Sequence, residues 1–430
     1  MLDARHVVTS RIASEFKRFP DIDLKPLDVS MLDPREASLA RAIDRAVHRR
    51  WISLTTVIGH ASNRIVHKLD SQVGATLLVA SSQLLLLDKI PDHAVINCAV
   101  EWVKNNGQPR ATGFVNAVLR KITRLREELL ERGSIGEPDQ FLRSDGSAWR
   151  LSEPVFKDSV DYQTGFPRKS WKRLLNEFGE KRASQIAFSS IAEPPILLTA
   201  PSNTALPEEL IQHEEPNFGV VPQGVNLTSL FSNHKSLRVQ DPTSAKALSL
   251  IENLHPKRIL DVCAGRGTKT KQLRSLFPNA TIAATEPNDA RREYLQELAN
   301  EIDVIVYSQE TDGPTEPFDL VIVDTPCSNS GVFSRRPEAK YRYDKKHIDS
   351  LVDLQQEILQ DATSVLQNKG YLLYATCSID AAENDKQVDW LTEKYQMKLV
   401  SDHSTFPSGF PGSEPSKWRD GGFVTLLKAR

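Results

Sequence analysis

The hydrophobic positions divide the chain into a helical part and a part in which strands and helices alternate. From about Arg35 to Arg132, apolar residues recur at spacings of three and four, and few glycines interrupt them. This spacing is typical of amphipathic helices, and Pro91 and Pro109 mark turns between them. We therefore predict an all-α bundle in this part of the chain.

A less regular middle region follows the helical part. Residues 133–157 are rich in Gly, Ser, Asp and Pro and show little periodicity, which predicts a linker. Residues 169–191 have the pattern of an amphipathic helix that the pair Pro194-Pro195 ends, and Ile196–Thr199 is a candidate for a short strand. We expect a small mixed α/β subdomain here.

From about Leu237 onward, short apolar runs alternate with helical patterns. The strand candidates are residues 258–262, 281–285, 304–307, 320–324 and 371–375, and the helix candidates are residues 268–276, 289–300 and 347–366. Such alternation predicts βαβ units and a doubly wound, mostly parallel sheet. The expected division is therefore a helical domain at 1–140, a linker with a small α/β subdomain at 141–235, and an α/β domain at 236–430.

The composition narrows the class of protein. The chain has 430 residues, of which 40% are hydrophobic and 26% charged, as in ordinary globular proteins of more than one domain. No apolar stretch reaches the roughly 20 residues of a membrane span, and the first residues lack an apolar secretory core. The four cysteines form no Cys-x-x-Cys pair, which argues against a disulfide framework and a metal site. We expect a cytoplasmic protein without membrane or metal partners.

The charge of the chain limits how it could bind nucleic acid. The formal net charge is −2, unlike that of a generic nucleic-acid binder, although the first third of the chain has more basic than acidic residues. Any contact with RNA must therefore come from local patches.

Cys327 and Cys377 are the strongest candidates for chemistry. Each follows a short apolar run, so both are expected at the carboxyl ends of strands in one parallel sheet, the edge at which ligands bind. Asp324 stands beside the first thiol. This context favours nucleophilic chemistry, whereas Cys98 and Cys263 are better interpreted as small hydrophobic residues.

A glycine turn follows the first predicted strand. Gly265 and Gly267 would let the backbone approach a nucleotide closely, and Glu286, at the end of the second strand, could accept hydrogen bonds from ribose hydroxyls. A purely structural turn stays an alternative, because the three-glycine fingerprint is absent. Since no phosphate-binding Gly-Lys-Ser/Thr sequence is present, S-adenosylmethionine fits better than a nucleoside triphosphate.

One acid and two thiols meet the needs of methylation at carbon 5 of cytosine. This carbon is a poor nucleophile until a thiolate adds to carbon 6 while an acid protonates nitrogen 3. A second group must then remove the carbon 5 proton so that the adduct can collapse.

Several motifs resemble one family. Asp324-Thr325-Pro326-Cys327-Ser328 with the basic segment 335–341, and Thr376-Cys377-Ser378 with Glu383-Asn384, look like the paired cysteine motifs of the Fmu/RsmB-like (NOL/NOP/Sun group) 5-methylcytosine RNA methyltransferases. The segments 239–244 and 420–423 are similar to that family's entry into the core and its closing strand, and the segments 74–104 and 113–120 resemble the NusB-like helical RNA-binding domain of its ribosomal RNA members.

This resemblance implies a fold and a set of roles. The fold would be a Rossmann-like class I methyltransferase domain behind a NusB-like bundle, acting as a monomer on RNA, with 16S ribosomal RNA favoured. Cys377 would be the nucleophile, Cys327 the releasing base, Asp324 the partner of nitrogen 3, and Lys269 a contact near cofactor and cytosine. The residues expected to bind S-adenosylmethionine are Cys263, Ala264, Gly265, Gly267, Lys269, Glu286, Asp312 and Asp324.

The chain departs from the family pattern in two segments. Arg266 and Thr268 replace a proline and a glycine in the cofactor turn, and Leu198-Thr199-Ala200-Pro201 stands where an Arg-Ile-Asn-like segment is expected. The first departure suggests an alternative hypothesis, a non-catalytic RNA-binding or ribosome-assembly protein that keeps the fold. An amino-group methyltransferase is disfavoured, because Asp324-Thr325-Pro326-Cys327 is not its Asn/Asp-Pro-Pro-Tyr/Phe motif.

Basic residues follow the first cysteine motif. Arg335, Arg336, Lys340 and Arg342 are candidates for positioning RNA phosphates, although such a charge run is often only a solvated surface.

Overall fold

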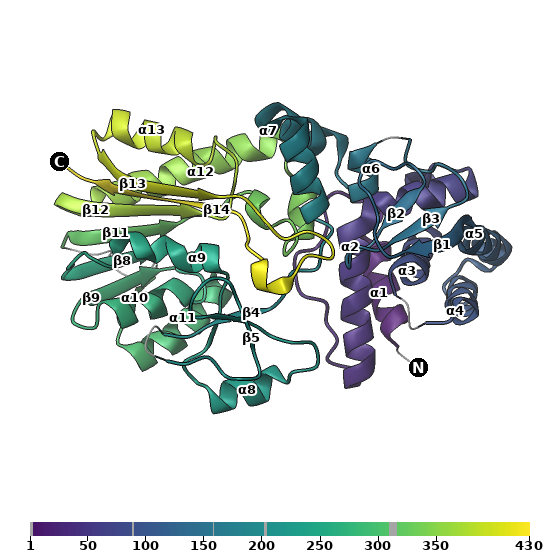
Figure 1. Cartoon of the computed structure of the whole chain (residues 1–430), viewed down its shortest axis with the longest axis horizontal. Helices are drawn as coiled ribbons and strands as arrows, with labels where there is room; N and C mark the ends of the chain where they lie inside the picture. Colours follow the sequence, from purple (N-terminus) through teal and green to yellow (C-terminus); the bar gives the residue numbers. More distant parts are fainter. Residues whose placement is uncertain (1–2, 88–89, 158, 202–203, 309–315) are drawn as a thin grey trace. The chain divides into compact units, whose positions relative to one another are not determined.

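The computed structural model describes residues 3–87, 90–157, 159–201, 204–308 and 316–430, which form two compact units (Figure 1). The first unit contains Met1–Pro194, Phe333–Arg342 and Gly409–Glu414, and the second contains Pro195–Val332, Tyr343–Ser408 and Pro415–Arg430. The division into three domains at residues 140 and 235 stays a prediction.

Five helices build the larger part of the first unit. They are α1 (Ala4–Glu15), α2 (Pro34–Ser62), α3 (Ser71–Leu86), α4 (Asp92–Asn105) and α5 (Thr112–Leu125). Three of them begin where an aspartate side chain, Asp3, Asp33 or Asp70, accepts a hydrogen bond from the backbone of the first turn. Residues 73–85 of α3 are all buried, so this apolar run is the central helix of the bundle. The predicted all-helical region is confirmed.

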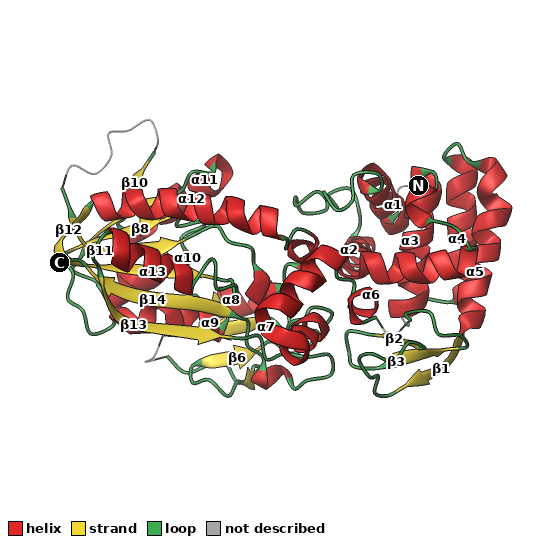
Figure 2. Cartoon of the chain, turned by 90° about the horizontal axis from the view of Figure 1, so that it is seen from above, coloured by secondary structure: helices red, strands yellow, loops and turns green. Residues whose placement is uncertain are grey.

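The prediction that the helical pattern continues to Arg132 is wrong, and so is the linker at 133–157. Three strands, β1 (Arg126–Leu130), β2 (Gln140–Leu142) and β3 (Ala148–Leu151), form an antiparallel sheet in the order β1-β3-β2 (Figure 2). Arg126 donates a hydrogen bond to the carbonyl of Leu84 and stacks 4.9 Å from the ring of Trp149. These contacts and the pairing with β3 outweigh the helical propensity of the charged sequence.

The middle region contains a long helix and a small sheet. Helices α6 (Val160–Thr164) and α7 (Arg168–Ser189) follow β3, and α7 confirms the helix predicted at 169–191. Four short strands then form a sheet in the order β5-β6-β4-β7. They are β4 (Leu197–Thr199), β5 (Ile211–Gln212), β6 (Phe218–Val220) and β7 (Arg238–Val239). Helices α8 (Leu227–Asn233) and α9 (Pro242–Lys246) flank β7 in the chain.

The second unit contains a seven-stranded sheet in the order β10-β9-β8-β11-β12-β14-β13. Its strands are β8 (Arg258–Val262), β9 (Thr281–Thr285), β10 (Ile305–Tyr307), β11 (Phe318–Asp324), β12 (Leu366–Thr376), β13 (Lys398–Thr405) and β14 (Gly422–Lys428). Strands β8 to β12 pair in parallel, and β14 and β13 continue the sheet antiparallel. The predicted mostly parallel sheet is therefore confirmed.

Alternate residues of the strands build a core on each face of this sheet. Ile259 and Ile322 contribute to one core and Leu260 and Val323 to the other. The helices that follow the strands are α10 (Thr268–Leu276), α11 (Asp289–Ile302), α12 (Lys345–Ser364) and α13 (Asp385–Lys394). The strand order reverses between β8 and β11, and a crevice at the carboxyl ends of the strands is expected at such a point.

Candidate active site

The structure brings Cys327 and Cys377 together at this edge. Strands β11 and β12 pair in parallel with Asp324 opposite Ala375, so the segments after the two strands begin side by side. The two Sγ atoms lie 3.0 Å apart, and the Sγ of Cys377 also donates a hydrogen bond to the Oδ1 of Asn329 at 3.2 Å. The thiols can therefore act on the same small group of atoms.

A cavity of about 150 Å³ opens beside Cys377. Lys269 and Asp324 also line it, and the Nζ of Lys269 lies 2.6 Å from the Oδ2 of Asp324. Cys327 is buried, 9% exposed, and is not part of this lining. A ligand in the cavity would thus meet the sulfur of Cys377 and the charged pair directly.

The surroundings of Cys327 and Lys269 change how readily these two groups ionise. The hydrogen bond with Cys377, together with burial, raises the pKa of Cys327 well above its usual value. Burial disfavours the charged form of Lys269, but Asp324 outweighs this effect and raises the pKa of Lys269. Lys269 therefore stays protonated at neutral pH, while Cys327 is held as a thiol.

A buried carboxylate, Glu383, holds the two cysteine segments together. Its Oε1 accepts hydrogen bonds from the backbone N–H of Ser328 at 2.8 Å and from the Nε2 of Gln355 at 3.1 Å. Its Oε2 accepts hydrogen bonds from the hydroxyls of Ser328 and Ser378. Ser328 follows Cys327 and Ser378 follows Cys377, so one side chain fixes the segments that carry both thiols. Sequence reasoning noted Glu383 only as part of a motif and missed this role.

Two glycines let the same segments approach closely. The N–H of Gly331 donates to the carbonyl of Cys377, and the N–H of Gly421 donates to the carbonyl of Gly331. A Cβ atom added at Gly331 would lie 2.5 Å from the backbone of Gly421, so only glycine fits here without movement of the chain.

Replacement of Glu383 by glutamine is expected to loosen both cysteine segments. Both carboxylate oxygens of Glu383 accept hydrogen bonds, whereas the amide nitrogen of glutamine can only donate. At least one of the present donors would therefore face an N–H, and an unsatisfied buried group costs about 1–3 kcal/mol. We expect the free energy of unfolding to fall by about 2 kcal/mol in urea titrations. Methyl transfer is expected to slow as well, since a small misplacement of reacting groups can cost about 100-fold.

The control for this substitution is Glu357→Gln, which makes the same chemical change on an exposed position of α12. It should leave stability and methyl transfer unchanged. Equal effects of the two substitutions would contradict the positioning role of Glu383.

The turn between β8 and α10 has the backbone geometry that a nucleoside would need. Cys263, Gly265 and Gly267 adopt positive φ angles of 60°, 62° and 82°. A Cβ atom at Gly265 would meet nothing within 4 Å, whereas one at Gly267 would lie 2.4 Å from Leu298. The left-handed φ at Gly267 favours glycine there, with Leu298 close by, and Gly265 leaves an open surface. Burial raises the pKa of the Cys263 thiol to about 12, so it stays neutral.

Glu286 supports this turn. Its Oε2 accepts a hydrogen bond from the N–H of Gly265 at 2.8 Å, and its Oε1 accepts one from the N–H of Asn288 at 2.9 Å. Each carboxylate oxygen keeps a second lone pair, so the side chain can still accept from ribose hydroxyls. Ala264 donates its N–H to the carbonyl of Thr285, which joins the turn to β9. The remaining cofactor candidate, Asp312, lies outside the described residues.

The two departures in the turn lie on its surface. Arg266 and Thr268 are both exposed, and the guanidinium of Arg266 lies 4.4 Å from the ring centre of Tyr294 on α11. Arg266 is therefore held against a neighbouring helix. Gly265 and Gly267, on either side of it, have the positive φ angles that form the turn.

The expectation that Lys340 positions RNA phosphates is wrong. Its side chain is fully buried in the first unit, where its Nζ donates hydrogen bonds to the carbonyls of Arg49 and Thr164 at 2.7 and 2.9 Å. Burial also lowers the pKa of Lys340 well below its usual value. Lys340 thus anchors the segment 333–342 in this unit instead of facing solvent.

Within the described ranges, no three His, Cys, Asp or Glu side chains are grouped so that they could hold a metal ion. Among the helices that the structure describes, none is long and apolar enough to cross a membrane.

Comparisons with known proteins agree with this geometry. The family model "16S rRNA methyltransferase RsmB/F" matches residues 247–415, and the NusB family model matches residues 2–124. Ribosomal RNA small subunit methyltransferase B of Xanthomonas campestris pv. campestris is 27% identical over 435 residues, which cover 92% of this chain and 89% of that protein. The protein of the same name from Serratia proteamaculans is 26% identical and covers 74% of this chain and 73% of its own length.

Solved structures share the fold. The crystal structure of PH0851 has a TM-score of 0.70 at 21% identity and covers 99% of both chains. The structure of NSun6 from Pyrococcus horikoshii has a TM-score of 0.51 at 17% identity and covers 61% of this chain and 98% of that one. Taken with the paired cysteines, these matches show that the chain belongs to the RsmB/F family of S-adenosylmethionine-dependent rRNA methyltransferases and carries a NusB domain in front.

Proposed function

We propose that this protein methylates carbon 5 of a cytosine in small-subunit (16S) ribosomal RNA through a covalent cysteine adduct. The observation that carries the proposal is the cavity lined by Cys377, Lys269 and Asp324, with the Sγ of Cys327 3.0 Å from that of Cys377. The reaction would take place in the cytoplasm and need only one copy of the chain.

The first task of the site is to activate the base. Attack of the Cys377 thiolate forms a bond to carbon 6 and moves the electrons of the carbon 5–carbon 6 double bond into the ring. The Lys269–Asp324 pair then supplies a proton or hydrogen bond at nitrogen 3, where negative charge develops. Carbon 5 becomes nucleophilic as a result.

The second task is to release the product. While Cys377 is bound to carbon 6 it carries no thiol, so the hydrogen bond that raises the pKa of Cys327 is absent and Cys327 can release its proton to solvent. The Cys327 thiolate then takes the carbon 5 proton, the carbon 6–sulfur bond breaks and Cys377 leaves as a thiolate.

The cofactor would bind over the β8–α10 turn. S-adenosylmethionine, when bound, supplies an electrophilic methyl group. Cys263, Ala264, Gly265 and Gly267 would present the backbone to it, and Glu286 would accept hydrogen bonds from its ribose. Lys269 and Asp324 would adjoin its reactive end, and Asp312 is proposed from the sequence alone.

The size of the cavity indicates how RNA would enter. Its volume of about 150 Å³ is below the roughly 300 Å³ at which pockets for whole small ligands begin, and it suits a single base. The target cytosine would therefore have to leave its stack.

Transfer of a labelled methyl group tests the proposal. Incubation of the protein with small-subunit ribosomal RNA and methyl-labelled S-adenosylmethionine is expected to label the RNA at a cytosine that becomes resistant to bisulfite conversion. The same RNA with 5-methylcytosine already in place should accept no label. Labelling only at an amino group would refute the proposed reaction.

The competing hypothesis is a non-catalytic RNA-binding or ribosome-assembly protein, suggested by Arg266 and Thr268. Calorimetric titration with S-adenosylmethionine separates the two, because the competing hypothesis expects no heat of binding at millimolar ligand. The exposed positions of both side chains favour the enzyme.

A further inference from the structure

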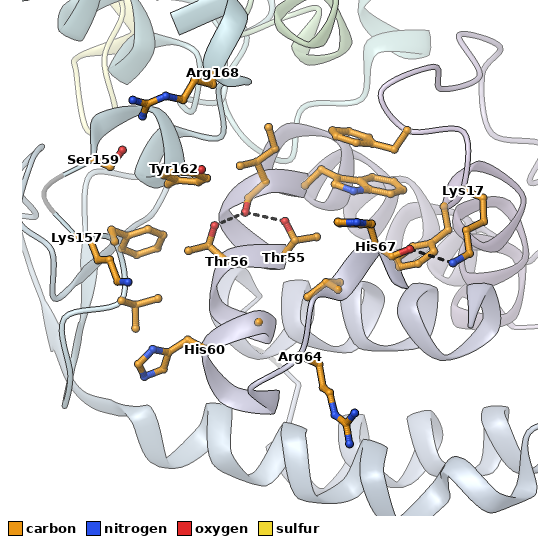
Figure 3. Close-up of a pocket in the computed structure, with 18 residues that line it drawn as sticks. Lys17, Thr55, Thr56, His60, Arg64, His67, Lys157, Ser159, Tyr162 and Arg168 are labelled. Atoms are coloured by element: carbon orange, nitrogen blue, oxygen red, sulfur yellow. Dashed lines mark hydrogen bonds between the residues drawn. The ribbon is translucent and has the colours of Figure 1, made fainter. Parts of the chain in front are cut away.

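The first unit contains a cavity of about 860 Å³ whose lining includes no residue of the proposed active site (Figure 3). The described lining comes from four parts of the chain: residues 16–19, the second half of α2, the turn at 64–67, and residues 155–157 with 159–168. Figure 3 shows Lys157 and Tyr162 from the last segment opposite Lys17 and His67, with Thr55 and Thr56 of α2 between them and His60 below. The NusB match ends at residue 124, so the helical domain alone does not complete this cavity.

The described lining of the cavity carries basic side chains. It contains the cationic or titratable side chains of Lys17, His60, Arg64, His67, Lys157 and Arg168. None of the described lining residues is Asp or Glu. His60 and Arg168 have acidic neighbours outside the lining, Glu153 at 2.8 Å and Asp161 at 4.0 Å.

Two of these cations have no partner among the described residues. Among the residues that the structure describes, the exposed side chains of Arg64 and Lys157 form no hydrogen bond or ion pair. The Nζ of Lys17, in contrast, donates to the carbonyls of His67 and Leu69 at 2.9 and 2.7 Å. Arg64 and Lys157 therefore keep all their donors for an anionic ligand.

Aromatic rings form the apolar part of the lining. They belong to Phe16, Phe19, Trp51, Phe156 and Tyr162. The rings of Phe19 and Trp51 stack at 4.7 Å, and that of Tyr162 is 41% exposed. A nucleic-acid base can stack on such a ring, while its phosphates pair with cations.

We propose that this cavity binds a single-stranded segment of the RNA substrate, with a base against Tyr162 and phosphates at Arg64 and Lys157. The inference rests on the proposed function and adds to it an RNA contact that is separate from the reacting base. A single strand is favoured because the bases of a duplex are stacked on one another and offer few faces to aromatic side chains.

Binding of a labelled oligoribonucleotide of about 12 residues tests the proposal, since single-strand sites of this kind span about 4–16 nucleotides. Fluorescence anisotropy is measured on the full chain without S-adenosylmethionine. The double substitution Arg64→Gln with Lys157→Gln is expected to raise Kd about tenfold and to reduce the salt dependence of log K by about 1.4, or about 0.7 per lost phosphate contact.

A matched control removes the same charge elsewhere in this unit. Lys104 and Arg110 are exposed and do not line the cavity, so Lys104→Gln with Arg110→Gln should leave Kd within about twofold of the original value. Equal losses of affinity for the two double variants would overturn the proposal.

Tyr162 gives a test that changes no charge. Tyr162→Ala should weaken binding about tenfold through the loss of stacking, whereas Tyr162→Phe, which keeps the ring, should bind as the original chain does. The same sequence annealed into a duplex should compete poorly. A duplex that binds equally well, with no effect of Tyr162→Ala, would show a duplex site and refute the single-strand proposal.

Methyl-transfer kinetics separate this inference from the function it rests on. The Arg64/Lys157 double variant should raise KM for RNA and leave kcat unchanged. If the protein methylates RNA but the cavity variants bind single strands normally, only the cavity proposal fails. If single strands bind through the cavity but no methyl group is transferred to RNA, only the proposed reaction fails.

Discussion

Replacement of Cys377 by alanine is expected to lower methyl transfer to RNA by about 10³-fold or more, because Cys377 carries the only thiol among the described residues that line the cavity. Without addition of sulfur to carbon 6, carbon 5 of the base stays too poor a nucleophile. Binding of S-adenosylmethionine should persist, since the β8–α10 turn contains no contact with this side chain. Single-turnover transfer of a labelled methyl group to small-subunit ribosomal RNA measures the effect.

The control is Cys98→Ala. Cys98 is an exposed free thiol on α4, so its loss should leave the rate unchanged. The cavity lining assigns the attack to Cys377 and not to Cys327, because Cys327 is buried and does not line the cavity. A Cys377→Ala variant that retains a tenth of the rate, with Cys327→Ala inactive and free of adduct, would reverse the two roles.

The sequence predicted the parallel core of the second unit well because its central strands contain short, largely buried apolar runs, such as Leu320–Val323 in β11 and Tyr371–Ala375 in β12. Strands β8 and β9 begin and end where the pattern placed them, and so does α10. Parallel strands are buried on both faces, so their apolar residues follow one another and can be recognised in a single sequence. The same signal placed both cysteines at strand ends, and their proximity followed from strand pairing alone.

Strands at exposed edges could not be predicted in this way. β13 is largely exposed and polar, and β1 consists mostly of charged residues. Their conformation depends on pairing with β14 and β3, which are partners that the local sequence does not reveal. The intrinsic β-propensity of a segment predicts its conformation poorly where pairing with a distant strand decides it.

The supporting side chains of the site also depend on contacts distant in sequence. Glu383 accepts hydrogen bonds from Ser328 and Gln355, which are 55 and 28 residues away. Lys340 lies close to Cys327 in sequence, yet its Nζ binds the carbonyl of Arg49, 291 residues away. A run of basic residues cannot show which member is buried, so the prediction that Lys340 faces RNA is wrong, whereas the predicted placement of both thiols at strand ends is confirmed.

Replacement of Cys327 by alanine is expected to trap a covalent complex between protein and RNA. The Cys377 thiolate can still add to carbon 6 and the methyl group can still be transferred, but the base 3.0 Å from the attacking sulfur is gone. Asp324 is paired with Lys269 and Asn329 carries a neutral amide, so neither replaces a thiolate as a base. The carbon 5 proton then stays, and the carbon 6–sulfur bond cannot break by elimination.

The adduct would be seen as a slowly migrating band on a denaturing gel when Cys327→Ala is mixed with small-subunit ribosomal RNA and S-adenosylmethionine. The double variant Cys327→Ala/Cys377→Ala is the matched control and should give no band, because it lacks the attacking sulfur. RNase treatment should return the trapped protein close to its free mobility. A folded Cys327→Ala variant that binds RNA, releases methylated product at the original rate and forms no adduct would show that another group removes the proton, and the proposed division of work between the two thiols would be wrong.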